Sequence, residues 1–489
     1  MPINLAVQTL VLRSLGPMGY GSYSFLTGVF ADVISFFESG TTIAFYNKLC
    51  QRPNERTLVG FYWRFVGVVA LFICMGAGGI MLSGLGDRIW PGQLRLCVWL
   101  AVAFAIGTWA LGMAEKIVDA YGLTTSGETA RFLQKCAGLC LIILCVGAGA
   151  LDLTVYFVIQ CLLVLLLVGL WQAVLVRGGH SLGSCSSISF SLAKKYALEF
   201  WSYSHPLIVY TAIGMATSVA DRWLLQTFGG SVEQGFYGLS YQVGIVCFLL
   251  TGAMAPLLAR EFSKAFADGD LHRMRQQFER QIPRFYAVSA FFGIFLATQA
   301  DRVAVLLGGD LYRKAWLPVM LMSCYPIHQT YGQLSGSLFF ATGQTRLYRN
   351  IGVSGMLLGL IVSFWLLAPR AVGGLNLGAT GLAIKMVAVQ LIGVNIQLWF
   401  NSRYLDLPFR RFLGQQVVVV LTLGVFAVTA RLLSNWIMAT PIPGLFASGI
   451  LYTLGGVGWA WVFAPMLGVR REDLGKQLSA GMRRLRVLI

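Results

Sequence analysis

The feature of this sequence that most constrains its fold is a long succession of apolar runs, most of them long enough to cross a lipid bilayer. A helix needs about 20 mainly apolar residues to span the hydrocarbon core. Hydrophobic residues make up 57% of the 489 residues and charged residues only 12%, whereas a soluble domain is roughly 25% charged. We therefore predict an all-α polytopic membrane protein.

The apolar runs predict about fourteen transmembrane helices, and a count of twelve or thirteen also fits because boundaries read from sequence slip by several residues. The first run is shorter than the others, and the ninth is only weakly apolar. The predicted spans are residues 2–14, 22–45, 59–82, 95–120, 131–150, 153–176, 198–226, 236–258, 284–300, 318–340, 348–368, 377–400, 412–433 and 444–467.

The distribution of Lys and Arg between the spans predicts the orientation of the chain. Short cytoplasmic loops carry an excess of these residues. With both termini in the cytoplasm, most basic residues outside the spans fall in cytoplasmic turns and in the tail 468–489. The net charge of +17 is then explained by membrane orientation, and no nucleic-acid partner is expected.

The connections between the spans are short. The longest, residues 259–283, is rich in charge and is predicted to form an amphipathic helix on the membrane surface, against anionic lipid headgroups. No loop is large enough for a soluble catalytic domain, and no Walker A sequence is present. The sequence therefore predicts neither an ATPase nor another enzyme, and no cofactor or metal site.

Two glycine-rich stretches suggest an internal repeat. "LRSLGPMGYGSYSF", residues 12–25, and "LLQTFGGSVEQGFYGLSYQVG", residues 224–244, each leave an apolar run through an apolar-Gly step, Leu15-Gly16 and Phe228-Gly229. They lie six predicted spans apart, so two halves with the same orientation are expected, each beginning with an extracytoplasmic hairpin. A chance similarity between two glycine-rich turns is the alternative.

Ionisable residues within the spans are functional candidates, because a charge at the bilayer centre costs at least ~2.5–3.5 kcal/mol on insertion scales. Asp32 lies near the middle of the second span, and Glu38 lies closer to its cytoplasmic end. Both could couple transport to H⁺ or Na⁺, and both could instead belong to structural pairs. Arg64 could bind an anionic headgroup or snorkel to the interface, and Lys385 is placed too deep to snorkel easily.

A second group of polar residues lies near span ends or within a later span. Asp221 and Arg222 end the seventh span and could form an interfacial pair, while Arg13 holds the corresponding place at the end of the first. His328 lies within the tenth span among glutamine and tyrosine residues. It could relay protons, or it could be a hydrogen-bonded buried histidine.

Three stretches together resemble the bacterial polysaccharide (O-antigen) repeat-unit flippases, or Wzx-type transporters. These belong to the multidrug/oligosaccharidyl-lipid/polysaccharide exporter superfamily. Residues 12–25 are similar to that family's Arg-x-Leu-Gly-Pro-x-x-Tyr-Gly hairpin. "ADRWLLQTFGGSVEQGFYGLSYQV" is similar to its Asp-Arg…Leu…Gly…Gly-x-Tyr step, and "LGATGLAIKMVAVQ" to its Leu-Gly-Ala-x-Gly-Ala-Ala entry to span twelve.

The resemblance implies a fold of two pseudo-symmetric six-helix lobes, residues 1–180 and 190–411, around a central cavity, followed by two spans at 412–467. It implies alternating access in the bacterial inner membrane. The substrate would be an undecaprenyl-diphosphate-linked oligosaccharide, moved to the outer leaflet for polysaccharide polymerase machinery. The headgroup candidates are then Arg64, Lys385, Arg13 and Arg222, and the ion-coupling candidates are Asp32, Glu38, Asp221 and His328.

Two questions remain open: why the first span is short, and which related function the chain could have instead. Residues 2–14 cover only about 20 Å as a helix, so either the first span is truncated or the assigned start lies downstream of the true one. A cation-coupled drug or metabolite exporter of the same superfamily is the nearest alternative, and a membrane-embedded polysaccharide enzyme is a more distant one. A drug exporter would favour an acidic or aromatic cavity without buried Arg and Lys.

Overall fold

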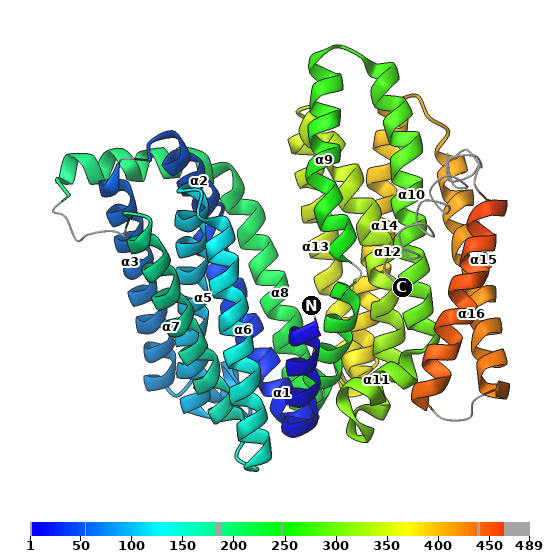
Figure 1. Cartoon of the computed structure of the whole chain (residues 1–489), viewed down its shortest axis with the longest axis horizontal. Helices are drawn as coiled ribbons and strands as arrows, with labels where there is room; N and C mark the ends of the chain where they lie inside the picture. The colour runs from blue at the N-terminus through cyan, green and yellow to red at the C-terminus, as the bar shows by residue number, and fades with distance from the viewer. Residues whose placement is uncertain (1, 54, 181–187, 247, 438–440, 464–489) are drawn as a thin grey trace. The chain divides into compact units, whose positions relative to one another are not determined.

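The computed structural model describes residues 2–53, 55–180, 188–246, 248–437 and 441–463, which form helices joined by short turns (Figure 1). The predicted basic tail 468–489 lies outside the described residues. Among those residues, eight helices are long and apolar enough to cross a membrane, and a bent pair would make a ninth. The prediction of an all-helical membrane protein agrees with this pattern.

The eight helices coincide with eight of the predicted spans. The bent pair consists of α10 (Leu271–Thr298) and α11 (Ala300–Gly308), which meet at 75° where the weakly apolar ninth span was predicted. The eight are α3 (Arg56–Leu82), α5 (Arg95–Ala120), α6 (Thr124–Gly147), α7 (Leu153–Arg177), α13 (Thr345–Leu367), α14 (Gly378–Tyr404), α15 (Phe409–Ile437) and α16 (Pro441–Val462).

The remaining predicted spans fall on helices that are too polar or too broken to pass as uniform apolar spans. α12 (Trp316–Ala341) illustrates the reason, because 15 of its 26 residues are buried against protein. A helix that faces protein can carry polar residues that lipid would not tolerate. The other helices of this kind are α1 (Pro2–Glu38), α2 (Thr41–Gln51), α8 (Phe190–Val246) and α9 (Phe248–Ala267).

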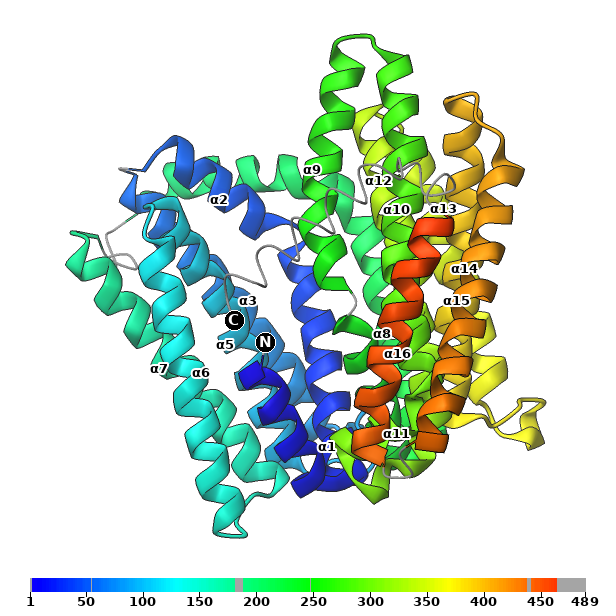
Figure 2. The same ribbon diagram turned by 45° about the vertical axis from the view of Figure 1, so that its right-hand side comes forward.

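Two glycines interrupt the helical backbone in equivalent places. Gly16 in α1 has φ 62° and ψ −178°, and Gly230 in α8 has φ 73° and ψ −176°. Glycine adopts positive φ without the steric penalty of a Cβ atom. Figure 2 shows α1 as a hairpin whose first arm descends from the N-terminus and whose second arm rises toward α2. The turn predicted at the Leu15-Gly16 step is therefore present. The break in α8, at Gly230, lies one residue after the predicted Phe228-Gly229 step.

The two glycine-rich stretches also pack against each other. A Cβ atom on Gly21 would lie 1.7 Å from the Ser231 carbonyl oxygen, and one on Gly235 would lie 2.1 Å from that of Pro17. Gly21 thus faces Ser231, one turn before Gly235, and Gly235 faces Pro17, one turn before Gly21. A local two-fold axis between the two stretches requires this reciprocal contact. Small residues allow such backbone contact between membrane helices, and the Ser22 hydroxyl donates to the Ser231 Oγ at 3.0 Å.

The chain divides into two compact units. Unit 1 contains residues up to Gly235 together with Ser363–Gly378, and unit 2 contains Phe236–Val362 and the residues from Ala379 onward. In unit 1, α5 packs against α1, α2, α3 and α7. In unit 2, α12 packs against α9 and α10, while α15 packs against α10 and α16. The short elements are α4 (Gly86–Ile89), η1 (Asp310–Ala315) and η2 (Arg370–Val372).

Residues 259–283 do not form a separate surface helix. They are the end of α9 and the beginning of α10, joined by a tight turn in which the Asp270 carboxylate accepts a hydrogen bond from the Arg273 backbone amide at 2.8 Å. Phe262 and Phe278 are fully buried between the two helices. The charged pattern of this segment reflects the outer face of a helical hairpin.

Candidate functional site

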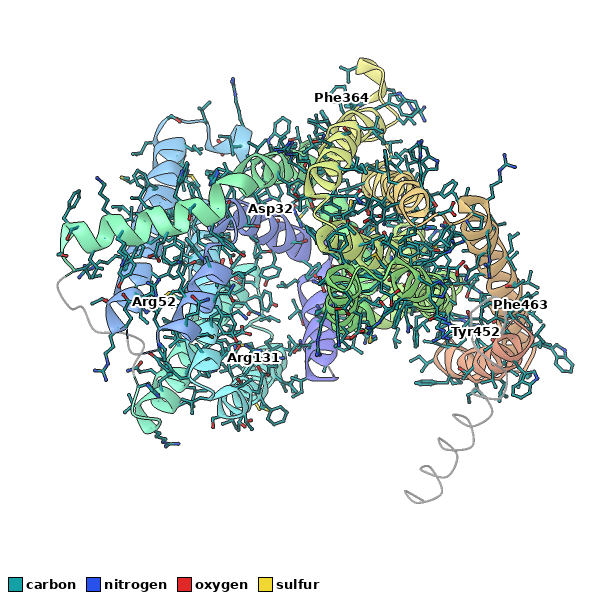
Figure 3. The ribbon with its side chains drawn as sticks, turned by 90° about the horizontal axis from the view of Figure 1, so that it is seen from above. Asp32, Arg52, Arg131, Phe364, Tyr452 and Phe463 are labelled. Carbon is teal, nitrogen blue, oxygen red and sulfur yellow. The ribbon has the colours of Figure 1, made fainter. Side chains whose placement is uncertain are left out.

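The clearest charged site in unit 1 joins the second arm of α1 to α8. The Arg222 Nε lies 3.5 Å from the Asp32 carboxylate, and the Ser218 hydroxyl donates to the same oxygen at 2.6 Å. The Asp32 and Arg222 side chains are only 25% and 19% exposed. Figure 3 labels Asp32 on its helix. Two residues predicted for different roles are therefore partners in one ion pair.

Neighbouring backbone groups hold the Arg222 guanidinium in place. It donates to the Ser24 carbonyl at 3.3 Å. A Cβ atom on Gly28 would lie 2.2 Å from Arg222 Cζ, so glycine at this position makes the space for the guanidinium. The backbone carbonyl of Arg222 accepts a hydrogen bond from the Gln234 side chain at 2.6 Å. The position of the ion pair is thus fixed by both glycine-rich stretches.

Asp221 lies beside Arg222 in sequence but has a different environment. Its side chain is buried, and its carboxylate accepts a hydrogen bond from the Ser363 hydroxyl at 2.5 Å. Ser363 belongs to α13 but to unit 1. The interfacial pair and the coupling role expected for Asp221 both stay predictions.

A polar pocket of about 210 Å³ lies between the first arm of α1, α6 and α7. Most of its polar lining consists of side-chain amides, so we name it the amide pocket. The apolar remainder of its wall includes Gly138 and Leu163. Side-chain amides both donate and accept hydrogen bonds, and the ammonium group of a lysine can donate three hydrogen bonds. The polar residues that line it are Asn4, Gln8, Gln134, Lys135 and Gln160.

Sequence reasoning missed the amide pocket because it searched the spans for charge. Gln160, within the apolar stretch "YFVIQCLLV", is the signal that could have identified it. Lys135 lies near the start of the predicted span 131–150, and α6 begins well before it, at Thr124. Tyr156 lies one turn from Gln160 on α7, and its ring packs 4.8 Å from that of Tyr23. An aromatic surface thus continues from the pocket toward the α1 turn.

Three predicted residues of unit 1 lie at separate places. Arg13 is exposed on the first arm of α1, and Arg64 is exposed on α3. Glu38 is partly buried and ends α1, directly before Ser39 and Gly40 break the helix with φ values of 37° and 80°. The structure therefore does not gather all the predicted headgroup residues into one cluster within this unit.

Two predicted residues lie in unit 2. Lys385 on α14 is 8% exposed and packs against α13, where a Cβ atom on Gly359 would lie 2.8 Å from the lysine Cε. His328 on α12 has its ring 5.8 Å from that of Tyr286. Its Nδ1 has no hydrogen-bond partner within the described part of the chain. Lys385 is buried, and its headgroup role stays a prediction.

No family model matches the sequence, and no curated protein matches it. Solved structures, however, share its fold. An inward-facing multidrug resistance MATE family transporter of the MOP superfamily aligns with a TM-score of 0.69 and 11% identity, over 83% of this chain and 94% of that one. An outward-facing structure of such a transporter aligns with a TM-score of 0.54 and 13% identity, over the same shares of the two chains.

A third structure is a MOP superfamily transporter from Pyrococcus furiosus, for which a reversed polarity of the binding pocket is described as suggesting a different function. It aligns with a TM-score of 0.51 and 12% identity, over 83% of this chain and 91% of that one. At these identities the comparisons concern the backbone arrangement. The chain thus has the fold of the MOP-superfamily transporters.

Proposed function

We propose that this protein is a flippase that moves an undecaprenyl-diphosphate-linked oligosaccharide from the inner to the outer leaflet of a bacterial inner membrane. The fold supports a transporter. Structures that share it are described as inward-facing and outward-facing, which supports alternating access here. The positions of Lys and Arg support cytoplasmic termini.

The amide pocket is the observation that carries the proposed substrate class. A sugar offers many hydroxyl groups, each a donor and an acceptor, and burying them without partners is costly. The side chains of Gln8, Gln134 and Gln160 offer both functions within one pocket of an otherwise apolar bundle. Lys135 adds a cation that suits a phosphate oxygen. The pocket therefore matches a hydroxyl-rich anion better than an apolar cationic drug.

The Asp32–Arg222 pair supplies a route for ion coupling. A diphosphate oxygen and the Asp32 carboxylate would compete for the Arg222 guanidinium. When substrate engages Arg222, Asp32 loses its partner, and a carboxylate in an apolar setting then favours proton or cation uptake. Substrate binding and ion binding are coupled in this way. Glu38, Asp221 and His328 remain further coupling candidates, and Arg13, Arg64 and Lys385 further headgroup candidates.

The second candidate function is cation-coupled export of drugs or metabolites. Its supporting observation is the fold shared with multidrug resistance transporters. A cationic substrate would need an acidic partner, and Asp32 is one candidate. In this structure Asp32 is paired with Arg222, which favours the anionic substrate.

The function is tested by mass spectrometry of polyprenyl-linked lipids from a deletion strain and its parent. We expect a complete diphosphate-linked oligosaccharide to accumulate in the deletion strain, inaccessible from the outer face. Restored export on complementation is the control. Unchanged lipid pools and surface polysaccharide, together with increased drug sensitivity, would instead establish the drug exporter.

Replacing Lys135 by Gln should reduce export about ten- to hundredfold. A hydrogen bond to a charged group contributes about 1.5–3 kcal/mol, which corresponds to that range. Lys135→Arg should retain most activity, because it keeps the charge. Lys264→Gln, at an exposed position of α9, is the matched control for simple charge loss. Export rates at equal membrane levels provide the measurement, and equal rates in Lys135→Gln and wild type would remove Lys135 from the site.

A further inference from the structure

Unit 1 contains a second cavity, with the opposite chemistry. It measures about 420 Å³ and lies between the end of α1, α3 and the first half of α8. Its wall is aromatic and aliphatic, apart from the hydroxyl-bearing residues Ser39, Thr41 and Ser204. We name it the aromatic pocket, after the side chains of Phe36, Phe37, Phe61, Phe65, Phe200 and Trp201.

Two features of the sequence create this pocket: aromatic residues at helical spacing on α3, and the end of the α1 helix. Phe61, Phe65 and Val69 follow one another at intervals of one turn, so they lie on one face of α3. α1 ends just after Phe37, and the chain leaves in a new direction through Ser39 and Gly40. Figure 1 shows the first part of α8 crossing the end of this unit beside α2. Phe200 on this part of α8 stacks on Phe61 of α3.

A charged network adjoins the pocket at the predicted cytoplasmic side. Glu199, next to Phe200, lies 2.7 Å from Lys48 and 3.6 Å from Arg52; Figure 3 labels Arg52. Arg52 also lies 3.4 Å from Glu55. We name the three basic residues close to Glu199 the basic rim: Lys48, Arg52 and Lys195. They outnumber the two glutamates, so the rim is electropositive.

The basic rim and the aromatic pocket are continuous through side-chain contacts. The Thr57 and Tyr196 hydroxyls are 2.9 Å apart. The Tyr196 ring packs 5.3 Å from the Phe61 ring, which in turn stacks on Phe200 with centroids 5.8 Å apart and planes 7° apart. Thr57 lies about one turn before Phe61 on α3, about 6 Å along the axis. A headgroup at the rim and a chain in the pocket are therefore within reach of one amphiphile.

We propose that the aromatic pocket holds the first isoprenoid units of a polyprenyl diphosphate lipid when the lipid first binds, with the diphosphate at the basic rim before it engages Arg222. The inference rests on the proposed function and assigns the carrier chain a site of its own, separate from the amide pocket. The apolar wall suits hydrocarbon and leaves sugar hydroxyls without partners. The excess of positive charge suits a group with two phosphates better than a neutral lipid.

The test uses the purified full-length chain and two neighbouring exposed residues of α8. Ala197 lines the pocket, whereas Leu198 is 58% exposed and is not part of its lining. Ala197→Trp should fill the pocket, and Leu198→Trp is the matched control. Binding of undecaprenyl diphosphate is measured by native mass spectrometry. We expect Ala197→Trp to weaken this binding by about tenfold or more, because the isoprenoid chain loses its buried apolar contact. Leu198→Trp should bind as wild type does.

Further probes separate the chain from the headgroup and from bulk lipid. Lys195→Gln should weaken binding of undecaprenyl diphosphate and leave binding of undecaprenol unchanged. Undiminished binding of undecaprenyl diphosphate by Ala197→Trp would overturn the assignment. Equal binding of phosphatidylglycerol, with equal loss in Ala197→Trp, would also overturn it, since the pocket would then hold bilayer phospholipid.

The two proposals can fail separately. Normal lipid pools in the deletion strain would remove the flippase function while a binding loss in Ala197→Trp still supported a polyprenyl site. Accumulated lipid-linked oligosaccharide, together with unaltered binding in Ala197→Trp, would keep the flippase and remove the pocket.

Discussion

Replacing Arg222 by Gln should abolish export and lower the amount of folded protein in the membrane. The change leaves the Asp32 carboxylate without the cation that lies 3.5 Å away. Breaking a buried ion pair costs about 3–5 kcal/mol, and partial exposure of this pair reduces the expected effect to about 1–3 kcal/mol. Export of the lipid-linked oligosaccharide and thermal unfolding of the purified protein give the two measurements.

The double variant Asp32→Asn/Arg222→Gln distinguishes structure from transport. Removing both charges together eliminates the unpaired carboxylate. The amount of protein in the membrane and its unfolding temperature should therefore return close to those of the wild type. Export should remain lost, because neither the competing cation nor the titratable group is present. Normal export by the double variant would show that the pair only stabilises the fold, and both residues would leave the list of functional candidates.

Replacing Gly21 by Ala should prevent the protein from reaching a stable fold. The new methyl group would lie 1.7 Å from the backbone oxygen of Ser231, and backbone cannot move aside as a flexible side chain can. Overpacking commonly costs about 1–3 kcal/mol, and we expect at least the upper end here. Gly235→Ala should have an effect of similar size, since it meets the Pro17 oxygen at 2.1 Å.

The matched control for these variants is Gly67→Ala in α3, where a Cβ atom would meet nothing within 4 Å. It should be neutral or slightly stabilising, because alanine favours the helix. Unfolding temperature in detergent and membrane abundance report the outcome. Wild-type stability of Gly21→Ala would contradict the close contact between residues 17–21 and 231–235.

The sequence was most informative where a helix meets lipid. The eight uniformly apolar helices were all predicted, because lipid demands long runs without charge. The break at Gly16 was also predictable, since a Leu-Gly-Pro step interrupts an apolar run. Residues 259–283 were misjudged as a loop with a surface helix, because the charged outer face of a buried hairpin has the same periodicity as an interfacial helix.

The contacts within the site could not be predicted from periodicity. Asp32 and Ser218 are 186 residues apart, and no local pattern specifies that their helices meet. The amide pocket assembles single residues from α1, α6 and α7, each unremarkable in its own segment. Lys385 could be recognised as too deep to snorkel from its place within one span, but no local pattern specifies its contact with Gly359 of α13.

The separation of Asp32 from its partners has a consequence for biosynthesis. At about 5–20 residues per second, the 186 residues that separate Asp32 from Ser218 require roughly 10 to 40 seconds of translation. Throughout that interval the second arm of α1 carries a carboxylate whose insertion into lipid costs about 2.5–3.5 kcal/mol. The second arm of α1 is therefore made with this carboxylate unpaired, and Asp32 gains Ser218 and Arg222 as partners only after the ribosome has produced α8.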